Sequence, residues 1–285
     1  MKILVTGGDG QLAKDVVWAA RAAGYDVEAV SRERLDITNE AKVIAALSSW
    51  RPELIVNCAA WTAVDACEGD PERAHLVNAT GVSNLLRGAA TGNSHVVHIS
   101  TDYVFDGTKD GPYIEADDTN PQSVYGQSKL AGEQIAIAGG ATVVRTSWVC
   151  GYGGNNMVKT ILRLAKEHDE LTFVDDQRGH PSFTADLAPR LLDLGLARQA
   201  GLFHLTNQGA VSWFEFARDV LSAAGHDPER VSPIATADLQ PQRPAPRPSN
   251  SVLANDAILT AGFGPLLRDF REPLAELVTQ LTTVD

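Results

Sequence analysis

The order of apolar and polar positions along the chain predicts strands that alternate with helices. Five short apolar runs have the length and composition of buried strands, at residues 2–6, 25–30, 53–57, 95–101 and 141–147. Segments of helical composition lie between them, at residues 12–23, 39–50, 71–90 and around 125–129. This alternation predicts an α/β fold with a Rossmann-like, doubly wound parallel sheet.

The second half of the chain predicts a smaller α/β unit. Its expected elements are helices at 157–167, 184–198 and 212–224, a strand at 171–174, and a final helix that opens at Gly264-Pro265. Ser212 and Glu215 form a capping box, and residues 233–248 are too rich in proline for a helix or a central strand. We therefore expect an NAD(P)-binding domain over 1–150, to which part of 165–225 returns, and a C-terminal substrate domain mainly over 151–285.

Composition and charge exclude several classes of protein. The chain has 285 residues, of which 44% are hydrophobic and 21% charged, as in ordinary globular proteins. A net charge of −12 argues against a nucleic-acid partner. We expect a cytoplasmic protein without a membrane segment, because no signal peptide and no apolar run of about 18 residues is present. The three cysteines form no paired motif, so neither a disulfide framework nor a metal site is expected.

A glycine-rich turn joins the first strand to the first helix. Gly7-Gly8-Asp9-Gly10 is followed by Gln11-Leu12-Ala13, a spacing that lets the backbone approach a pyrophosphate at the helix N-terminus. The second strand ends in Ser31 and Arg32, which suit the 2′-phosphate of NADPH. Glu33 suits an unphosphorylated ribose equally well, so NADH remains possible.

Candidate chemistry gathers between Ser100 and Lys129. Tyr125 and Lys129 are four residues apart and share one face of a helix, where the ammonium is expected to lower the pKa of the phenol and make the tyrosine a usable proton donor. Thr101, at the end of the fourth strand, would orient a substrate oxygen, with Ser100 as the rival hydroxyl. Asn155, in a glycine-rich aromatic stretch, and Arg243, in the proline-rich segment, are candidates to contact a polar or anionic ligand.

Several motifs resemble those of a known family. Thr6 to Leu12, Asn57 to Ala60 and Tyr125 to Lys129 are similar to the extended short-chain dehydrogenase/reductases. A closer resemblance to the dTDP-4-dehydrorhamnose reductases rests on Leu35-Asp36-Ile37-Thr38, Trp61 to Asp65, Ser100 to Gly107, Lys129 to Glu133, Arg145 to Val149 and Asp176 to Pro181. Ala13 departs from the usual third glycine, which serves helix packing.

The resemblance implies an oxidoreductase of carbohydrate biosynthesis. It would reduce the C4 keto group of dTDP-4-dehydro-6-deoxy-L-mannose with NAD(P)H, giving dTDP-L-rhamnose for cell-envelope polysaccharide. By motif, Tyr125 is the proton donor, Lys129 its support and Thr101 the hydrogen bond to the carbonyl. The implied cofactor contacts are Gly7, Gly10, Gln11, Leu12, Asp36, Ile37, Ala59 and Ala60, with Tyr125 and Lys129. The implied substrate contacts are Val64, Ser100, Asp102, Tyr103 and Trp148.

Two other classes share these features. A non-catalytic NADP-binding regulatory subunit of the methionine adenosyltransferase type has a similar fold, but the Thr101, Tyr125 and Lys129 set favours an enzyme. A nucleotide-sugar epimerase or dehydratase would use the same cofactor, and Asp102 stands where a further acid or base would act. Some relatives are metal-bridged dimers, yet no motif here identifies the bridging acids, so we expect no metal and a monomer or homodimer.

Overall fold

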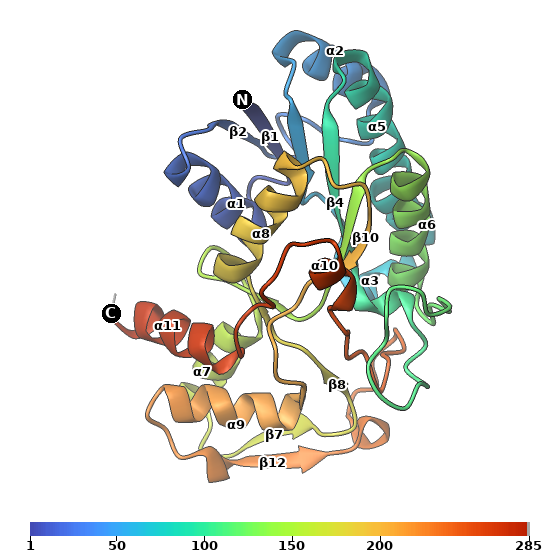
Figure 1. Cartoon of the computed structure of the whole chain (residues 1–285). Helices are drawn as coiled ribbons and strands as arrows, with labels where there is room; N and C mark the ends of the chain where they lie inside the picture. The colour runs from blue at the N-terminus through green and yellow to red at the C-terminus, as the bar shows by residue number, and fades with distance from the viewer. Residues whose placement is uncertain (284–285) are drawn as a thin grey trace.

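A six-stranded sheet forms the centre of the computed structural model, which describes residues 1–283 (Figure 1). The strand order is β10-β5-β4-β3-β1-β2, and every neighbouring pair is parallel. The strands are β1 (Lys2–Thr6), β2 (Asp26–Val30), β3 (Leu54–Asn57), β4 (His95–Thr101), β5 (Thr142–Thr146) and β10 (Gly201–His204). The predicted doubly wound parallel sheet is therefore confirmed.

Helices cover both faces of this sheet. On one face α1 (Gln11–Ala22) packs against α8 (Thr184–Leu196), and the other carries α2 (Glu40–Trp50), α5 (Gly81–Gly92) and α6 (Val124–Ala138). Each face of the sheet has its own apolar core, and alternate strand residues pack into one or the other. Ile3 and Val5 face α1 and α8, while Leu4 faces the opposite helices. Burial on both faces explains why the strands are continuous apolar runs.

A smaller unit lies beyond the carboxyl edge of the sheet, in the lower part of Figure 1. A short parallel pair, β7 and β12, packs with α7, α9 and α11 around its own apolar core. The elements of this region are α7 (Met157–Glu167), β7 (Leu171–Val174), α9 (Trp213–Ala223), η3 (Pro228–Arg230), β12 (Val231–Ile234), η4 (Thr236–Asp238) and α11 (Arg271–Thr282). The short helix α10 (Asp256–Thr260) instead packs against β10 and the core of the main sheet. Two short pairs connect it to the main sheet, β6 (Val149–Cys150) with β9 (Ser182–Phe183), and β8 (Arg178–Gly179) with β11 (Val211–Ser212).

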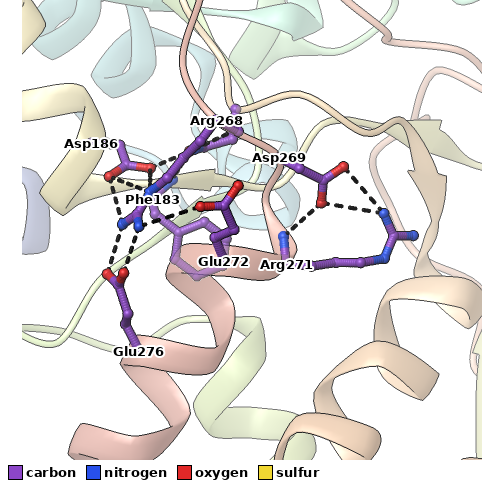
Figure 2. Close-up of polar contacts among 8 residues, drawn as sticks. Phe183, Asp186, Arg268, Asp269, Arg271, Glu272 and Glu276 are labelled. Atoms are coloured by element: carbon purple, nitrogen blue, oxygen red, sulfur yellow. Dashed lines mark hydrogen bonds and ion pairs between the residues drawn. The ribbon is translucent and has the colours of Figure 1, made fainter.

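Arg268 connects the two parts of the molecule (Figure 2). Its Nε donates to Asp186 Oδ2 on α8 at 3.0 Å, and its two terminal nitrogens donate to Glu276 on α11 at 2.5 and 2.6 Å. The Arg268 carbonyl also accepts a hydrogen bond from Asn207 at 3.1 Å. One side chain thus ties a helix of the main sheet to the last helix of the smaller unit.

The structure differs from the predicted elements in several places. The predicted helix at 71–90 consists of α4 (Pro71–His75), a π-helical turn η1 (Leu76–Thr80) and α5. The expectation that Gly264-Pro265 opens the last helix is wrong, because Arg190 binds the carbonyl oxygens of both residues and α11 begins only at Arg271. A short helix, α3 (Val64–Gly69), and a 3₁₀ turn, η2 (Asp102–Val104), were not predicted.

The predicted capping box of Ser212 and Glu215 is confirmed at the start of α9. Asn39 caps α2 by accepting from the Lys42 amide at 3.0 Å. Within residues 1–283 no helix has both the length and the apolar character needed to cross a bilayer.

Candidate active site

A cavity of about 650 Å³ opens at the carboxyl edge of the main sheet. It begins between β1 and β3, where the strand order reverses and where open α/β sheets place their ligands. The glycine turn forms its floor. Gly7 has φ +68°, and a Cβ on it would lie 2.8 Å from the Ala59 backbone, so only glycine allows β1 and the exit of β3 to approach this closely.

Most of the predicted cofactor residues line this cavity. They are Gly7, Gly10, Gln11, Leu12, Arg32, Asp36, Ile37, Ala59, Ala60, Tyr125 and Lys129. Ser31 does not line it. Arg32 Nε lies 3.4 Å from Asp36 Oδ2 with two thirds of its side chain exposed, whereas Arg34 is held by Glu28 at 2.5 Å. Of the two arginines that follow β2, only Arg32 is therefore available to the cavity.

Helix α6 presents Tyr125 and Lys129 to the same cavity. Ser123 caps the helix by accepting from the Gly126 amide at 3.1 Å, and both functional side chains are buried. Lys129 Nζ donates to the Ile99 carbonyl of β4 at 2.6 Å, which fixes its ammonium beside the strand that carries Thr101. Gly126 allows α6 to approach the backbone of Tyr103, since a Cβ there would lie 2.3 Å from the Tyr103 carbonyl oxygen.

The charges of this pair differ from the sequence-based expectation. Burial raises the pKa of Tyr125 above its usual range, so the prediction that Lys129 lowers it is wrong for this structure. The physical reason is that desolvation of the phenolate outweighs favourable interactions. Burial also lowers the pKa of Lys129 to about 8, although the negative charge of Glu133 opposes this. At neutral pH Tyr125 therefore keeps its proton and Lys129 is largely charged.

Two adjacent hydroxyls at the end of β4 have different partners. Ser100 Oγ donates to Glu133 Oε2 at 2.7 Å, and that carboxylate also binds Arg145 in a buried ion pair at 2.5 Å. Thr101 Oγ1 donates to Asp102 Oδ1 at 2.9 Å and accepts from the Tyr103 amide at 3.3 Å. Ser100, Thr101 and Asp102 all line the cavity, but the Ser100 proton is committed to the protein interior.

Of the predicted substrate residues, Val64, Tyr103 and Trp148 also line the cavity. Trp148 has φ +45°, a conformation that bulky residues rarely adopt, and its indole stacks on Trp213 with ring centroids 3.5 Å apart. Such strain is found mainly at functional sites.

Asn155 and Arg243 lie outside the lining. Arg243 is exposed and contributes to a second pocket of about 220 Å³, together with Arg247. Asp65 of α3 binds both terminal nitrogens of Arg247, at 3.0 and 2.8 Å. Burial raises the pKa of Tyr103 to about 12, and the positive charges of Arg247 and Arg243 oppose this increase.

Several lining residues were not identified from the sequence. Asn57 accepts from Thr6 Oγ1 at 2.6 Å, and Trp61 lies 4.4 Å from the Arg73 guanidinium. Both could have been found, because Asn57 and Trp61 flank the Cys58-Ala59-Ala60 segment. Trp213 also lines the cavity, but nothing in the sequence connects it with Trp148.

Residues 1–283 contain no cluster of three histidine, cysteine or acidic side chains placed to hold a metal ion.

Comparison with known proteins agrees with this geometry. A family model described as RmlD substrate binding domain matches residues 1–283. A dTDP-4-dehydrorhamnose reductase of Mycolicibacterium smegmatis is 42% identical over 97% of this chain and 85% of its own length.

Two solved structures are similar over nearly the whole chain. A dTDP-4-dehydrorhamnose reductase of Clostridium acetobutylicum is 40% identical, with TM-score 0.93 over 99% of this chain and 100% of that one. The enzyme of Bacillus anthracis, solved with NADP, is 35% identical, with TM-score 0.93 over 98% of this chain and 99% of that one.

A Rossmann-like sheet whose cavity holds a Tyr-x-x-x-Lys pair defines an oxidoreductase of the extended short-chain dehydrogenase/reductase class. Within that class, the chain belongs to the dTDP-4-dehydrorhamnose reductase family.

Proposed function

We propose that this protein uses NADPH to reduce the C4 keto group of dTDP-4-dehydrorhamnose to dTDP-L-rhamnose. The observation that carries the proposal is the convergence of Thr101, Tyr125 and Lys129 in one cavity with the glycine turn. A hydroxyl, a protonated phenol and an ammonium are the groups that carbonyl reduction needs, because the developing alkoxide must be bound and protonated.

The donor set fits a dinucleotide. Gly7 and Gly10 allow close backbone approach at the start of α1, Ala59 and Ala60 leave room for a flat ring, and Arg32 would meet the 2′-phosphate. NADP in the Bacillus anthracis relative supports this choice of cofactor. When bound, the reduced nicotinamide supplies the hydride.

Tyr125 would act as the general acid. Burial raises its pKa, so the phenol holds its proton at neutral pH until charge develops on the C4 oxygen. Lys129, anchored on the Ile99 carbonyl, would then stabilise the phenolate that remains. Thr101 would hold the C4 oxygen, and the commitment of the Ser100 proton to Glu133 supports Thr101 over its rival.

Substrate contacts would come from both parts of the molecule. Val64, Asp102, Tyr103 and Trp148 line the region next to Tyr125, where the sugar would lie. Arg243, in the second pocket, is the candidate for the diphosphate, since Asp65 already binds Arg247.

The test is an activity measurement with product analysis. Purified protein with dTDP-4-dehydrorhamnose should oxidise NADPH in a one-to-one ratio, and NMR should identify dTDP-L-rhamnose. A panel of other nucleotide 4-ketosugars would define specificity for the base and the sugar. An unchanged nicotinamide absorbance with all of them would refute the reductase proposal and favour a purely cofactor-binding role.

A second candidate is a nucleotide-sugar epimerase or dehydratase, which the buried carboxyl of Asp102 beside Thr101 favours. Such an enzyme regenerates its cofactor. Conversion of the sugar without net consumption of NADPH would support that candidate instead.

A further inference from the structure

Asp102 is a buried carboxyl in the wall of the cavity with only one of its oxygens bonded. The residue is 2% exposed in η2, and its Oδ1 accepts the Thr101 hydroxyl proton at 2.9 Å. Its Oδ2 has no hydrogen-bond partner anywhere in the described chain. The Ser251 hydroxyl lies close enough to Asp102 to lower the pKa of this carboxyl, but its proton is donated to the Arg178 carbonyl at 3.3 Å. A buried carboxyl oxygen without a partner is costly, and it calls for an explanation.

The hydrogen bonds of Thr101 indicate what the Asp102 carboxyl does. A threonine hydroxyl has one proton and two lone pairs. Thr101 uses one lone pair for the Tyr103 amide and its proton for Asp102, so a single lone pair is left for the cavity, where the Tyr125 hydroxyl is its neighbour. A lone pair cannot donate to a carbonyl oxygen. While Asp102 is ionised, Thr101 therefore cannot make the hydrogen bond that the proposed reduction requires.

Protonation of Asp102 reverses this arrangement. The carboxyl O–H can then donate to Thr101 Oγ1, which fills both threonine lone pairs and frees the threonine proton. We propose that Asp102 is a positioning residue that sets the direction of the Thr101 hydroxyl: protonated Asp102 turns the Thr101 proton towards the C4 oxygen of the keto sugar, and ionised Asp102 withdraws it. This inference rests on the proposed reductase function.

The surroundings of Asp102 place its change of protonation in a pH range that kinetic measurements can reach. Burial raises the pKa of Asp102 to about 6, against smaller lowering effects from the Ser251 and Thr101 hydroxyls. Of the groups around it, Tyr103 on its own turn and Tyr125 on α6 stay neutral, because burial raises the pKa of both phenols. The charged groups beyond these tyrosines are Lys129 of α6, Asp65 of α3, and Arg243 and Arg247 of the proline-rich segment.

The sign of the pH dependence follows. As pH rises through the pKa of Asp102, the donating form of Thr101 is lost, and kcat/KM for the keto sugar falls about tenfold per pH unit. A second decrease is expected at higher pH, when Lys129 loses its proton at about 8. The first decrease belongs to Asp102 and the second does not, so a variant of Asp102 separates them.

The experiment compares wild-type protein with Asp102→Asn, measuring kcat/KM for the keto sugar at saturating NADPH from acidic to alkaline pH. The amide group that this substitution introduces donates to Thr101 at every pH. The first decrease in kcat/KM with rising pH should therefore vanish, while the second decrease, at higher pH, stays. The same first decrease in kcat/KM in both proteins would overturn the inference. Absence of turnover by wild-type protein at every pH would instead refute the proposed function, and the inference with it.

A second variant tests the same point without touching the cavity wall. Ser251→Ala removes a hydroxyl that lowers the pKa of Asp102, so the first decrease in kcat/KM should move to higher pH. An unmoved decrease would contradict the inference even if Asp102→Asn fails to fold. In a Thr101→Val background, Asp102→Asn should leave the shape of the pH profile unchanged, because no hydroxyl remains to be oriented. NADPH binding, followed by fluorescence, verifies that each variant is folded.

Discussion

At the scale of single residues, the candidate site depends on where hydroxyl protons point. Ser100 and Thr101 are adjacent on β4, and successive strand residues face opposite sides. Ser100 is thereby directed to the buried Glu133–Arg145 pair and Thr101 to the Asp102 carboxyl. The sequence identified both hydroxyls as candidates, and only the family resemblance favoured Thr101 over Ser100. The residues themselves could not decide, because the choice depends on partners at positions 102, 133 and 145.

Tyr125→Phe tests the proposed proton donor. Without the phenol, kcat should fall about 10²- to 10⁴-fold, because no other side chain is expected to replace the general acid. NADPH binding should change little, since the phenyl ring still fills the same space. Steady-state kinetics and fluorescence titration measure the two effects.

Tyr103→Phe is the matched control, because Tyr103 lines the same cavity with its ring centroid 5.5 Å from that of Tyr125. It should raise KM more than it lowers kcat. A larger loss of kcat in Tyr103→Phe than in Tyr125→Phe would remove Tyr125 from its proposed role.

Arg32→Ala tests the choice of cofactor. Loss of a charged contact to the 2′-phosphate should weaken NADPH binding by roughly tenfold or more and leave NADH binding within about twofold. Arg34→Ala is the control, because that guanidinium is held by Glu28 and does not line the cavity. Dissociation constants for both cofactors decide the outcome. Equal weakening of NADPH binding and NADH binding would show that Arg32 does not contact the 2′-phosphate.

At the scale of elements, the contact between α6 and the π-helical turn η1 organises one wall of the cavity. Asn78 of η1 binds the Trp61 backbone at 2.8 and 3.1 Å and the Ser128 hydroxyl at 2.9 Å. Gly132 allows the two elements to approach, since a Cβ there would lie 2.0 Å from the Asn78 carbonyl oxygen. The close approach thus holds Trp61 in the cavity wall.

Gly132→Ala should consequently destabilise the protein by about 1–3 kcal/mol, because overpacking forces α6 and η1 apart. Gly92→Ala is the control, since Gly92 also belongs to a helix, as the last residue of α5, but its Cβ would meet nothing nearer than 3.7 Å. That change should be neutral or stabilise by up to about 1 kcal/mol. Urea denaturation measures both, and equal stabilities would show that the wall tolerates the extra methyl group.

The elements themselves were predictable to different degrees. The central strands were predicted because burial on both faces leaves continuous apolar runs. The π-helical turn could not be predicted, because it depends on the contacts of Asn78 with Trp61 and Ser128, which are distant in sequence. The start of α11 was missed for a similar reason, since Arg190 binds the carbonyls at Gly264 and Pro265 from another helix.

At the scale of the whole molecule, the cavity is built from both the main sheet and the smaller unit. Trp213 of α9 reaches it from the smaller unit, while the catalytic candidates lie on β4 and α6. Motifs along the sequence revealed the sheet side of the cavity, because its residues follow strands directly. The contribution of α9 could not be inferred, since the relative placement of the two parts depends on contacts such as those of Arg268.

Arg268→Met tests this connection. The thioether keeps part of the packing but loses the bonds to Asp186 and Glu276, so the free energy of unfolding should fall by about 1–2 kcal/mol. Arg163→Met is the control, because its pair with Glu167 is largely exposed and should be worth at most about 0.5 kcal/mol. Chemical denaturation compares the two, and a loss no larger for Arg268 than for Arg163 would show that the connection is energetically minor.

The stacked indoles of Trp148 and Trp213 give the molecule an optical property of its own. The rings lie 3.5 Å apart at 8° to each other, close enough for their electronic transitions to couple. Such coupling produces a paired band of opposite signs in circular dichroism, whose intensity depends on ring separation and orientation. Because one indole follows the main sheet and the other opens α9, this band reports the relative position of the two parts directly, without a label and without turnover.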